Sequence, residues 1–224
     1  EQYVLRVHAP RTAAEAKPGS FVHITCAAAL LRRPMSIMRA DRNAGWLDIL
    51  YKAHGLGTGI LANRVSGETL SLIGPIGRPF KLDGYRGKPL LIGGGGGIPP
   101  MVFLAEHMKA DPDTPSPLVL MGSEVPFPFT TLPSKILVPG IPAGAIAAMP
   151  LLEDWRIANR LASTRDYPGC YRGLVTELAH AWISSLDADA RAEVEIYACG
   201  PTPMLRAVAE LAAEFSLPAQ ISLE

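Results

Sequence analysis

The chain has 224 residues, and its 21 lysine and arginine residues balance its 21 aspartate and glutamate residues, so the formal net charge is zero. A neutral chain without a basic block gives no support for nucleic-acid binding. The longest apolar stretch, residues 136–152, is short and contains three prolines and two glycines, which argues against a membrane-spanning helix. The residues after Glu1 do not follow a signal-peptide pattern. This length suits one large domain or two small ones around a sizeable core.

Three cysteines, Cys26, Cys170 and Cys199, stand far apart and include no C-x-x-C spacing. By themselves they make neither a disulfide framework nor a metal site. We therefore expect a reducing, cytoplasmic setting and no metal site within residues 1–224.

The first part of the chain, residues 1 to about 85, reads as short strands divided by turns. We expect strands at residues 3–9, 20–27, 32–40, 46–53 and 68–74. Residues 46–53 alternate apolar and polar side chains, which is the period of a half-buried strand. Residues 58–65 are the exception, a short helical segment that Thr58 is expected to cap. The pattern predicts a small antiparallel β-barrel or sandwich.

From Lys88 onward, strands are followed by helices. We expect strands at residues 89–94, 117–123 and 193–200, and helices at residues 99–110 and 201–215. Alternating strands and helices predict a mostly parallel sheet that is covered on both faces. Turn residues at 83–88 mark the boundary between the two parts, and the proline-rich residues 125–150 receive no assignment.

Five consecutive glycines, residues 93–97, end the first of these strands, and Pro99 and Pro100 begin the next helix. Backbone N–H groups at such a helix start suit an anion such as a phosphate. The run lacks the Lys-Ser/Thr pair of a Walker A loop, and Pro99 stands where G-x-G-x-x-G has its last glycine. A flexible turn is the alternative, but ligands of α/β sheets bind at strand carboxyl ends, which favours a binding loop.

A second strand end repeats this pattern, because Cys199 and Gly200 close a strand and Pro201 and Pro203 open a helix. A cysteine at this place is more often a small buried hydrophobe than a reactive group. Two glycine-bearing strand ends in one sheet make a dinucleotide crevice a better interpretation than either does alone.

The first part of the chain contains two further candidates. In the strand 32–37, Arg33 offers a planar fork for phosphate oxygens and Ser36 offers a hydroxyl that donates or accepts. Residues 54–59 form a glycine loop at a helix start, with the Thr58 hydroxyl available. A surface arginine on an edge strand and an ordinary capped turn are the alternatives.

Together these motifs resemble the ferredoxin-reductase superfamily and, within it, the electron-transfer subunits of two-subunit (class 1B) dihydroorotate dehydrogenases. The resemblance covers essentially the whole chain. "RRPMSI", "LYK" and "GLGTG" look like flavin contacts, "GPIGRPF" like an interdomain loop, and "GGGGGIPPM" and "CGPTPML" like nicotinamide-site motifs. Each is weak singly, whereas all of them in the right order are specific.

The resemblance implies a two-domain fold: an FAD-binding antiparallel β-barrel at residues 1–85 and an NAD-binding α/β domain with a parallel sheet at residues 86–217. It implies an oxidoreductase that passes reducing equivalents between NAD and FAD in pyrimidine biosynthesis. Its partner would be an FMN-containing catalytic subunit of dihydroorotate dehydrogenase in a hetero-oligomer. Residues 218–224 would begin a carboxyl-terminal segment whose cysteines, beyond Glu224, hold a [2Fe–2S] cluster.

Site residues follow from the same resemblance. It places Arg33 at a flavin phosphate, Ser36 near the reactive flavin nitrogen, and Cys199 beside the nicotinamide, with Ser36 and Cys199 as the catalytic candidates. The cofactor-binding candidates are Arg33, Pro34, Met35, Ser36, Leu50, Tyr51, Lys52, Gly57, Thr58, Gly94, Gly95, Gly96, Gly97, Cys199, Gly200, Pro201 and Met204. Met35 departs from many relatives in the wider superfamily, which carry a stacking aromatic residue there.

Other interpretations remain open. A related NADH- or NADPH-dependent reductase subunit, of the sulfide dehydrogenase or transhydrogenase type, would carry the same motifs. A nucleotide-sensing module that has lost its flavin site is the alternative from another class, against which Arg33, Ser36, Gly57 and Thr58 argue. Ser123 and Glu124 follow the second strand of the nucleotide domain, where a carboxylate would repel a 2′-phosphate, so we predict NAD over NADP.

Overall fold

A computed structural model describes residues 2–26, 31–82 and 86–223. The chain divides into two compact units, residues 1–80 and 81–224, a few residues before the predicted boundary. At this division the Phe80 N–H donates to the Pro18 carbonyl in unit 1. The backbone of Lys81 exchanges two hydrogen bonds of 2.8 Å with the side-chain amide of Gln220 in unit 2. Phe80 is therefore hydrogen-bonded within unit 1 and the next residue, Lys81, within unit 2.

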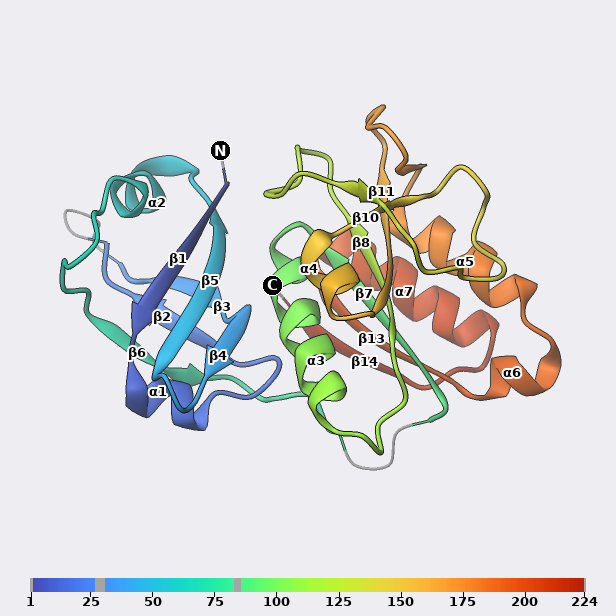
Figure 1. Cartoon of the computed structure of the whole chain (residues 1–224), viewed down its shortest axis with the longest axis horizontal. Coiled ribbons are helices and arrows are strands. Elements are labelled where there is room, and N and C mark those ends of the chain that lie inside the picture. The colour runs from blue at the N-terminus through green and yellow to red at the C-terminus, as the bar shows by residue number, and fades with distance from the viewer. Residues whose placement is uncertain (1, 27–30, 83–85, 224) are drawn as a thin grey trace. The chain divides into compact units, whose positions relative to one another are not determined.

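Unit 1 is the antiparallel β domain that the sequence predicts (Figure 1). Its sheets have the strand orders β1-β5-β4 and β3-β2-β6. The elements are β1 (Gln2–His8), α1 (Pro10–Glu15), β2 (Phe21–Ile24), β3 (Arg33–Ser36), β4 (Arg39–Asp41), β5 (Trp46–Lys52), α2 (Gly55–Ala62) and β6 (Leu72–Ile76). The last strand begins later than expected from the sequence.

The prediction that residues 46–53 form a half-buried strand with alternating exposure is wrong. β5 is buried without interruption from Leu47 to Tyr51, including Asp48, which is 3% exposed. Two charge-assisted hydrogen bonds, from Arg6 Nε and Nη2 to the Asp48 carboxylate at 2.7 and 2.8 Å, satisfy that carboxylate. Arg6 also lies over the Trp46 ring, 3.8 Å from its centroid. A polar residue can therefore be buried here because its partner covers it.

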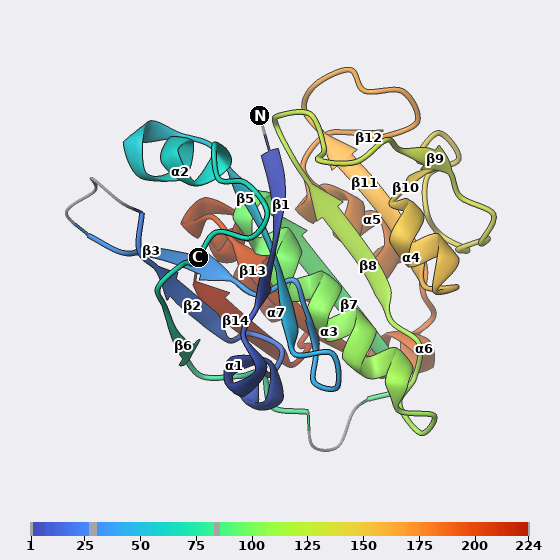
Figure 2. The same ribbon diagram turned by 60° about the vertical axis from the view of Figure 1, so that its left-hand side comes forward.

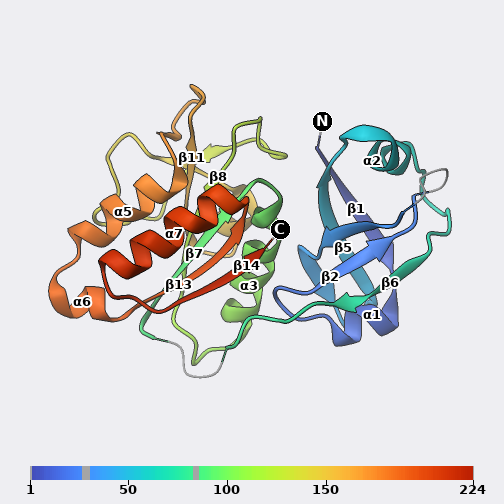
Figure 3. The ribbon, with the colours of Figure 1, turned by 180° about the vertical axis from the view of Figure 1, so that it is seen from behind.

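Unit 2 is built around a six-stranded parallel sheet with the order β12-β11-β8-β7-β13-β14. Its elements are β7 (Lys88–Gly94), the 3₁₀ turn η1 (Gly95–Gly97), α3 (Ile98–Ala110), β8 (Leu118–Gly122), β9 (Leu132–Pro133), β10 (Ala147–Ala148), α4 (Pro150–Asp154), β11 (Ala158–Ser163), β12 (Tyr171–Arg172), α5 (Val175–Ser185), α6 (Ala188–Ala192), β13 (Val194–Gly200), α7 (Thr202–Glu214) and β14 (Ala219–Leu223). α3 and α4 cover one face (Figure 2) and α5 and α7 the other (Figure 3), as predicted.

One hydrophobic cluster of unit 2 lies between the sheet and the helices α5 and α7. It joins alternate residues of β7, β8 and β13 to the inward faces of the two helices, such as Ile92, Leu120, Trp182 and Val208. The sheet strands are apolar on both faces, as expected for a buried parallel sheet. This rigid core fixes the strand ends on which the candidate site is built.

The proline-rich segment that the sequence left open and the carboxyl-terminal residues have a definite place. Residues 132–133 and 147–148 pair as β9 and β10. The Arg160 side chain, in a residue only 6% exposed, donates to the Ile136 carbonyl at 2.6 Å and so ties this proline-rich segment to β11. At the other end of the chain, β14 pairs in parallel with β13. The described residues of 218–224 therefore complete the sheet of unit 2, and the cluster segment expected after Glu224 stays a prediction.

Candidate functional site

The first candidate site is the start of α2 in unit 1. The prediction that Thr58 caps this helix is wrong, because the helix begins earlier, at Gly55, with His54 as the N-cap. The Thr58 hydroxyl instead accepts a hydrogen bond from the His54 N–H at 2.7 Å and donates to the His54 carbonyl at 2.6 Å. The N–H groups of the first turn after His54 have no partner within the helix. An added Cβ at Gly55 or Gly59 would meet nothing within 4 Å, so the turn is open on those sides.

Arg33 lies against this turn. A Cβ added at Gly57 would stand 2.8 Å from Arg33 Nε and 3.4 Å from Cζ and Nη2. The Arg33 guanidinium, whose Nη1 donates to the Leu31 carbonyl at 3.1 Å, therefore packs against the bare glycine backbone. A guanidinium beside a helix amino end combines charge with directed N–H donors, which is the arrangement that binds a phosphate group.

The other flavin candidates of unit 1 divide into buried and accessible residues. Met35, Leu50 and Tyr51 are 7–8% exposed and belong to the core of unit 1. Burial raises the pKa of the Tyr51 hydroxyl, with smaller contributions from Tyr3, on which its ring stacks, and from Cys26. The remaining candidates are partly or fully exposed, namely Pro34, Ser36 and Lys52. Unit 1 thus brings Arg33, Gly57 and Thr58 together, and Ser36 stands at the far end of β3.

The second candidate site lies where β7 and β13 end side by side in unit 2. Chain order along the sheet runs one way from β7 through β8 to β11, and the other way from β7 to β13 and β14. The reversal between β7 and β13 is the topological switch point at which open α/β sheets bind their ligands. Both glycine-bearing motifs lie at this point, as the sequence predicts, and the register pairs Cys199 with Gly93.

The two strand ends touch so closely that only glycine fits between them. A Cβ added at Gly97 would overlap the Cys199 carbonyl and lie 2.5 Å from the Gly200 nitrogen. A Cβ at Gly94 would collide with the Met204 sulfur, and one at Gly200 would stand 2.7 Å from Met204 Cε. The structure therefore brings together Gly94, Gly97, Cys199, Gly200 and Met204 in one tightly packed contact between the strand ends, which we call the crevice after the dinucleotide crevice that the sequence predicts at this edge.

The donors of this crevice differ from the expected ones. α3 begins with Ile98, Pro99 and Pro100, and prolines have no N–H, so its first turn offers fewer donors than an ordinary helix. The 3₁₀ turn of residues 95–97, which precedes these prolines, is the part of the loop that carries N–H groups, and Gly95 in it adopts a left-handed φ of 54° that favours glycine. Cys199 is 2% exposed, so its sulfur is mainly a packing group in this structure, and Pro201 is exposed.

Residues that sequence reasoning missed lie at the carboxyl ends of β8 and β11. The Phe127 ring lies 5.5 Å from Phe129 and 6.4 Å from Tyr167, between ring centroids. Arg165 follows β11, and its N–H donates to the Ser163 hydroxyl at 3.1 Å. The Ser123 hydroxyl donates to the Val125 carbonyl of its own loop at 2.7 Å, which leaves the exposed Glu124 as the acidic group. The aromatic residues Phe127, Phe129 and Tyr167, which follow these two strands in the sequence, were the signal from which this part of the site could have been predicted.

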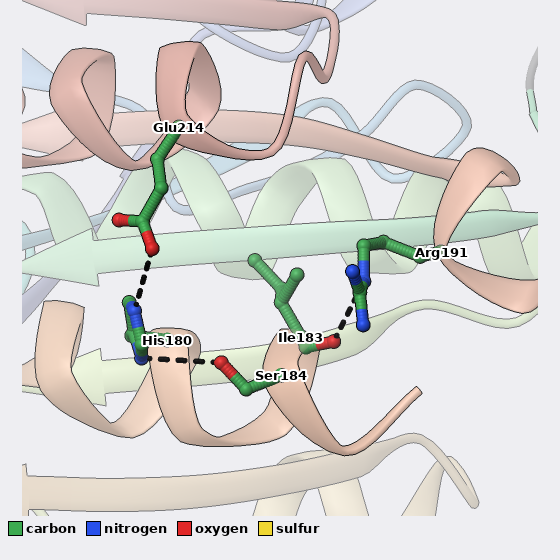
Figure 4. A network of polar contacts seen from close by, with 5 residues as sticks. All are labelled: His180, Ile183, Ser184, Arg191 and Glu214. Carbon is green, nitrogen blue, oxygen red and sulfur yellow. Dashed lines mark hydrogen bonds and ion pairs between the residues drawn. The ribbon is translucent and has the colours of Figure 1, made fainter. Parts of the chain in front are cut away.

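Two other features do not make a site. A cavity of about 210 Å³ lies beside Lys109, Trp155 and Arg156, but at the amino ends of β8 and β11, opposite to where such sheets bind ligands. On α5 and α7, His180 Nε2 lies 3.0 Å from a Glu214 carboxylate oxygen, and the Ser184 hydroxyl lies 3.3 Å from His180 Nδ1 (Figure 4). The His180 and Glu214 side chains are 47% and 55% exposed, so this group is a surface link between helices and no catalytic triad.

The described residues include no group of three or more histidine, cysteine or acidic side chains that could hold a metal ion. The three cysteines lie in separate places, with Cys26 and Cys199 buried and Cys170 half-buried. Burial raises the pKa of the Cys170 thiol. The described residues therefore do not fit a [2Fe–2S] cluster, which needs converging ligands. The same residues include no helix that could cross a membrane.

Solved structures define the class of protein to which this fold belongs. The NADH-dependent reduced ferredoxin-NADP oxidoreductase, studied for flavin-based electron bifurcation, matches 100% of this chain and 71% of its own chain, with a TM-score of 0.75 and 23% identity. The ferredoxin reductase of carbazole 1,9a-dioxygenase matches 99% and 64%, with a TM-score of 0.73 and 22% identity. The protein has the two-domain ferredoxin-reductase fold, as predicted.

Sequence relatives are more specific, although no family model matches the chain. The electron transfer subunit of dihydroorotate dehydrogenase B (NAD⁺) from Geobacillus sp. (strain WCH70) is 32% identical over 200 residues, which is 87% of this chain and 66% of the relative. The subunit of the same name from Desulforamulus reducens is 29% identical over 229 residues, 99% of this chain and 76% of the relative. The chain belongs to the family of dihydroorotate dehydrogenase B electron transfer subunits, and it spans about two thirds of the length of the first relative.

Proposed function

We propose that this chain is the flavoprotein electron-transfer subunit of a dihydroorotate dehydrogenase, with FAD in unit 1 and NAD in unit 2. The observation that carries the proposal is the glycine crevice at the switch point between β7 and β13, where Gly97 meets the Cys199 carbonyl. A side chain at Gly97 would collide with the backbone of β13 and push the two strand ends apart, so glycine is needed for the close packing that shapes the edge we assign to the dinucleotide.

The residues present fit both cofactors. In unit 1, Arg33 neutralises a phosphate while the open first turn of α2 donates N–H groups to its oxygens. In unit 2, the 3₁₀ turn of residues 95–97 donates to a second pyrophosphate. When bound, the two cofactors supply the hydride-transfer chemistry, and the protein supplies position and electrostatics. Ser36 is the candidate hydrogen-bond partner of the flavin ring, and Cys199 helps to place the nicotinamide through packing.

Nicotinamide selectivity follows from charge at the ends of β8 and β11. Glu124 follows the second strand of the nucleotide domain, where its carboxylate opposes a 2′-phosphate, whereas Arg165 on the neighbouring strand end would favour one. The strands pair in register at Gly122 and Ala162, so both charges belong to the same edge of the sheet. We assign NAD over NADP, with Glu124 as the discriminating group. A Glu124→Gln variant would raise the relative specificity constant for NADPH by about tenfold, equivalent to ~1.4 kcal/mol.

An electron-transfer subunit needs an acceptor, and the partner in this proposal is the FMN-containing catalytic subunit in a hetero-oligomer that serves pyrimidine biosynthesis. The relatives' names support this assignment. The setting is the cytoplasm, where thiols such as the three cysteines of this chain stay reduced. Since the described residues do not fit a [2Fe–2S] cluster, no step of this account depends on one.

The experiment is titration of the flavin-free chain with FAD, followed by anaerobic addition of NADH. One FAD per chain and reduction of the flavin by NADH are the expected results. The isolated chain should reduce artificial acceptors and leave dihydroorotate unchanged. A chain that binds NADH but no FAD would be the nucleotide-sensing module, and one that binds neither would refute both functions. Dihydroorotate turnover by this chain alone would contradict the assignment of a separate catalytic partner.

A further inference from the structure

Met204 stands apart from the other methionines of the chain. Six of the seven methionines, namely Met35, Met38, Met101, Met108, Met121 and Met149, are buried, each with at most 8% of its surface exposed. Met204, near the start of α7, is more accessible than any of these. Oxidation of methionine by peroxides follows access to the sulfur. Since Met204 is the most exposed methionine residue, we expect a limited dose of oxidant to react there before it reaches the other methionines.

The Met204 thioether also fills the crevice at the switch point. Its sulfur occupies the space next to Gly94, and its Cε lies 2.7 Å from where a Gly200 Cβ would be. The same Gly200 position is 3.0 Å from the Gly94 carbonyl oxygen and 3.2 Å from the Gly94 nitrogen. A change in the size or polarity of the thioether therefore acts on both glycine-bearing strand ends together.

We propose that Met204 is an oxidation site through which hydrogen peroxide lowers the affinity of unit 2 for the nicotinamide nucleotide. The inference rests on the proposed function, because it concerns regulation of that same crevice. In the reaction the sulfur lone pair takes one oxygen atom from hydrogen peroxide as the O–O bond breaks. Sulfur is oxidised by two electrons, peroxide is reduced, and one water leaves, so that the product is methionine sulfoxide and the balance is complete.

The sulfoxide changes the crevice in two ways. The flexible apolar thioether becomes a larger, polar group, and its oxygen is an acceptor that competes for the backbone N–H groups of the crevice. Because a polar group left poorly paired at a buried contact costs free energy, we expect the Kd for NADH to rise by roughly tenfold. FAD affinity should stay unchanged, because Arg33 and the α2 turn belong to unit 1.

Cysteine thiols compete with Met204 for hydrogen peroxide, and burial limits their reactivity. Cys26 and Cys199 are each 2% exposed. Cys170 is half-buried, and burial raises its pKa, so less of it is the reactive thiolate at neutral pH. A Cys170→Ser variant keeps this competitor out of the experiment.

The test treats the FAD-loaded Cys170→Ser chain with limited hydrogen peroxide and maps methionine sulfoxide by peptide mass spectrometry. The Kd for NADH is then measured by anaerobic calorimetry with the flavin already reduced by dithionite, so that no hydride transfer adds to the heat of binding. Met204→Leu removes the oxidisable sulfur, and Met149→Leu is the matched control on a buried methionine. We expect Met204 to oxidise first, the Kd to rise about tenfold in the Met149→Leu chain, and no change relative to its own untreated value in the Met204→Leu chain. Methionine sulfoxide reductases should restore binding by the parent chain.

Oxidation of other methionines before Met204, or an equal loss of NADH binding in the treated Met204→Leu chain, would overturn the inference and leave the proposed function intact. If Met204→Leu does not fold, binding that stays lost after enzymatic repair of the sulfoxide would overturn it as well. Failure of the untreated chain to bind NADH would instead refute the proposed function, and the inference with it.

Discussion

Replacement of Gly97 by alanine is the sharpest perturbation of the crevice. The added Cβ would overlap the carbonyl carbon and oxygen of Cys199 and lie 2.5 Å from the Gly200 nitrogen. All three atoms belong to the backbone of β13, which pairs with β7 on one side and β14 on the other. No side-chain rotation can relieve the contact, so the end of β13 or the loop of residues 95–97 has to move.

The magnitude follows from that geometry. Non-bonded carbon atoms pack at about 3.5–4.0 Å, so the strand ends must separate by roughly 1.5 Å to accept the methyl group. Overpacking of a core costs typically 1–3 kcal/mol and more where the structure cannot yield. Because the obstacle is the backbone of a central sheet, we expect Gly97→Ala to lower the free energy of unfolding of unit 2 by about 3 kcal/mol.

The assay is urea denaturation followed by circular dichroism and tryptophan fluorescence, with NADH binding measured on the folded fraction. Gly144→Ala is the matched control, because its Cβ would meet nothing within 4 Å and its φ is not left-handed. That control should change the unfolding free energy by less than about 1 kcal/mol. A Gly97→Ala chain as stable as Gly144→Ala, with unchanged NADH affinity, would refute the reasoning about the crevice.

Four further predictions concern other residues. Arg33→Ala should weaken FAD binding by about 10–100-fold in a fluorescence titration, which is the loss expected for a charge-assisted hydrogen bond. Arg32→Ala is the control and should leave FAD binding unchanged, because the Arg32 side chain binds Ser71. Thr58→Ala should lower the stability of unit 1 by about 1 kcal/mol in thermal unfolding, because the His54 N–H loses its acceptor. The pKa of Tyr51 is raised in the folded state, so its contribution to stability is present below pH ~10 and is lost as the pH rises further. Tyr51→Phe should therefore reduce the fall of the unfolding free energy at alkaline pH, and an unchanged fall would count against the burial effect. The specificity constant for NADH should exceed that for NADPH, and the opposite ratio in steady-state kinetics would contradict the role given to Glu124.

Much of this architecture was predictable because local signals and global fold agree. The change from period-two strands to alternating strands and helices near Lys88 predicted the two domains. Both glycine-bearing strand ends were predicted to belong to one sheet and to make a dinucleotide crevice, since ligands of α/β sheets bind at strand carboxyl ends. Strand order, which places the switch point between β7 and β13, needed the structure.

The failures have physical causes of their own. Asp48 looks solvent-facing in the sequence, but a distant arginine, Arg6, pairs with it and allows burial. The start of α2 was placed at Thr58 because threonine is a common cap, whereas the helix already begins at Gly55 and Thr58 binds back to His54. Arg165 and Tyr167 were missed because neither makes a short motif. Their significance comes only from the strand ends beside which they lie.

The central claim is that one chain holds FAD on unit 1 and a nicotinamide nucleotide on unit 2 and transfers reducing equivalents between them. Anaerobic stopped-flow absorbance tests this claim most directly. The FAD-loaded chain is mixed with NADH, and the visible absorbance band of the oxidised flavin is followed. The account predicts a saturable, NADH-dependent loss of that band, weakened by Gly97→Ala through NADH binding and by Arg33→Ala through loss of FAD. A chain that binds both cofactors yet leaves the flavin oxidised, or one that takes up no FAD at all, would contradict it.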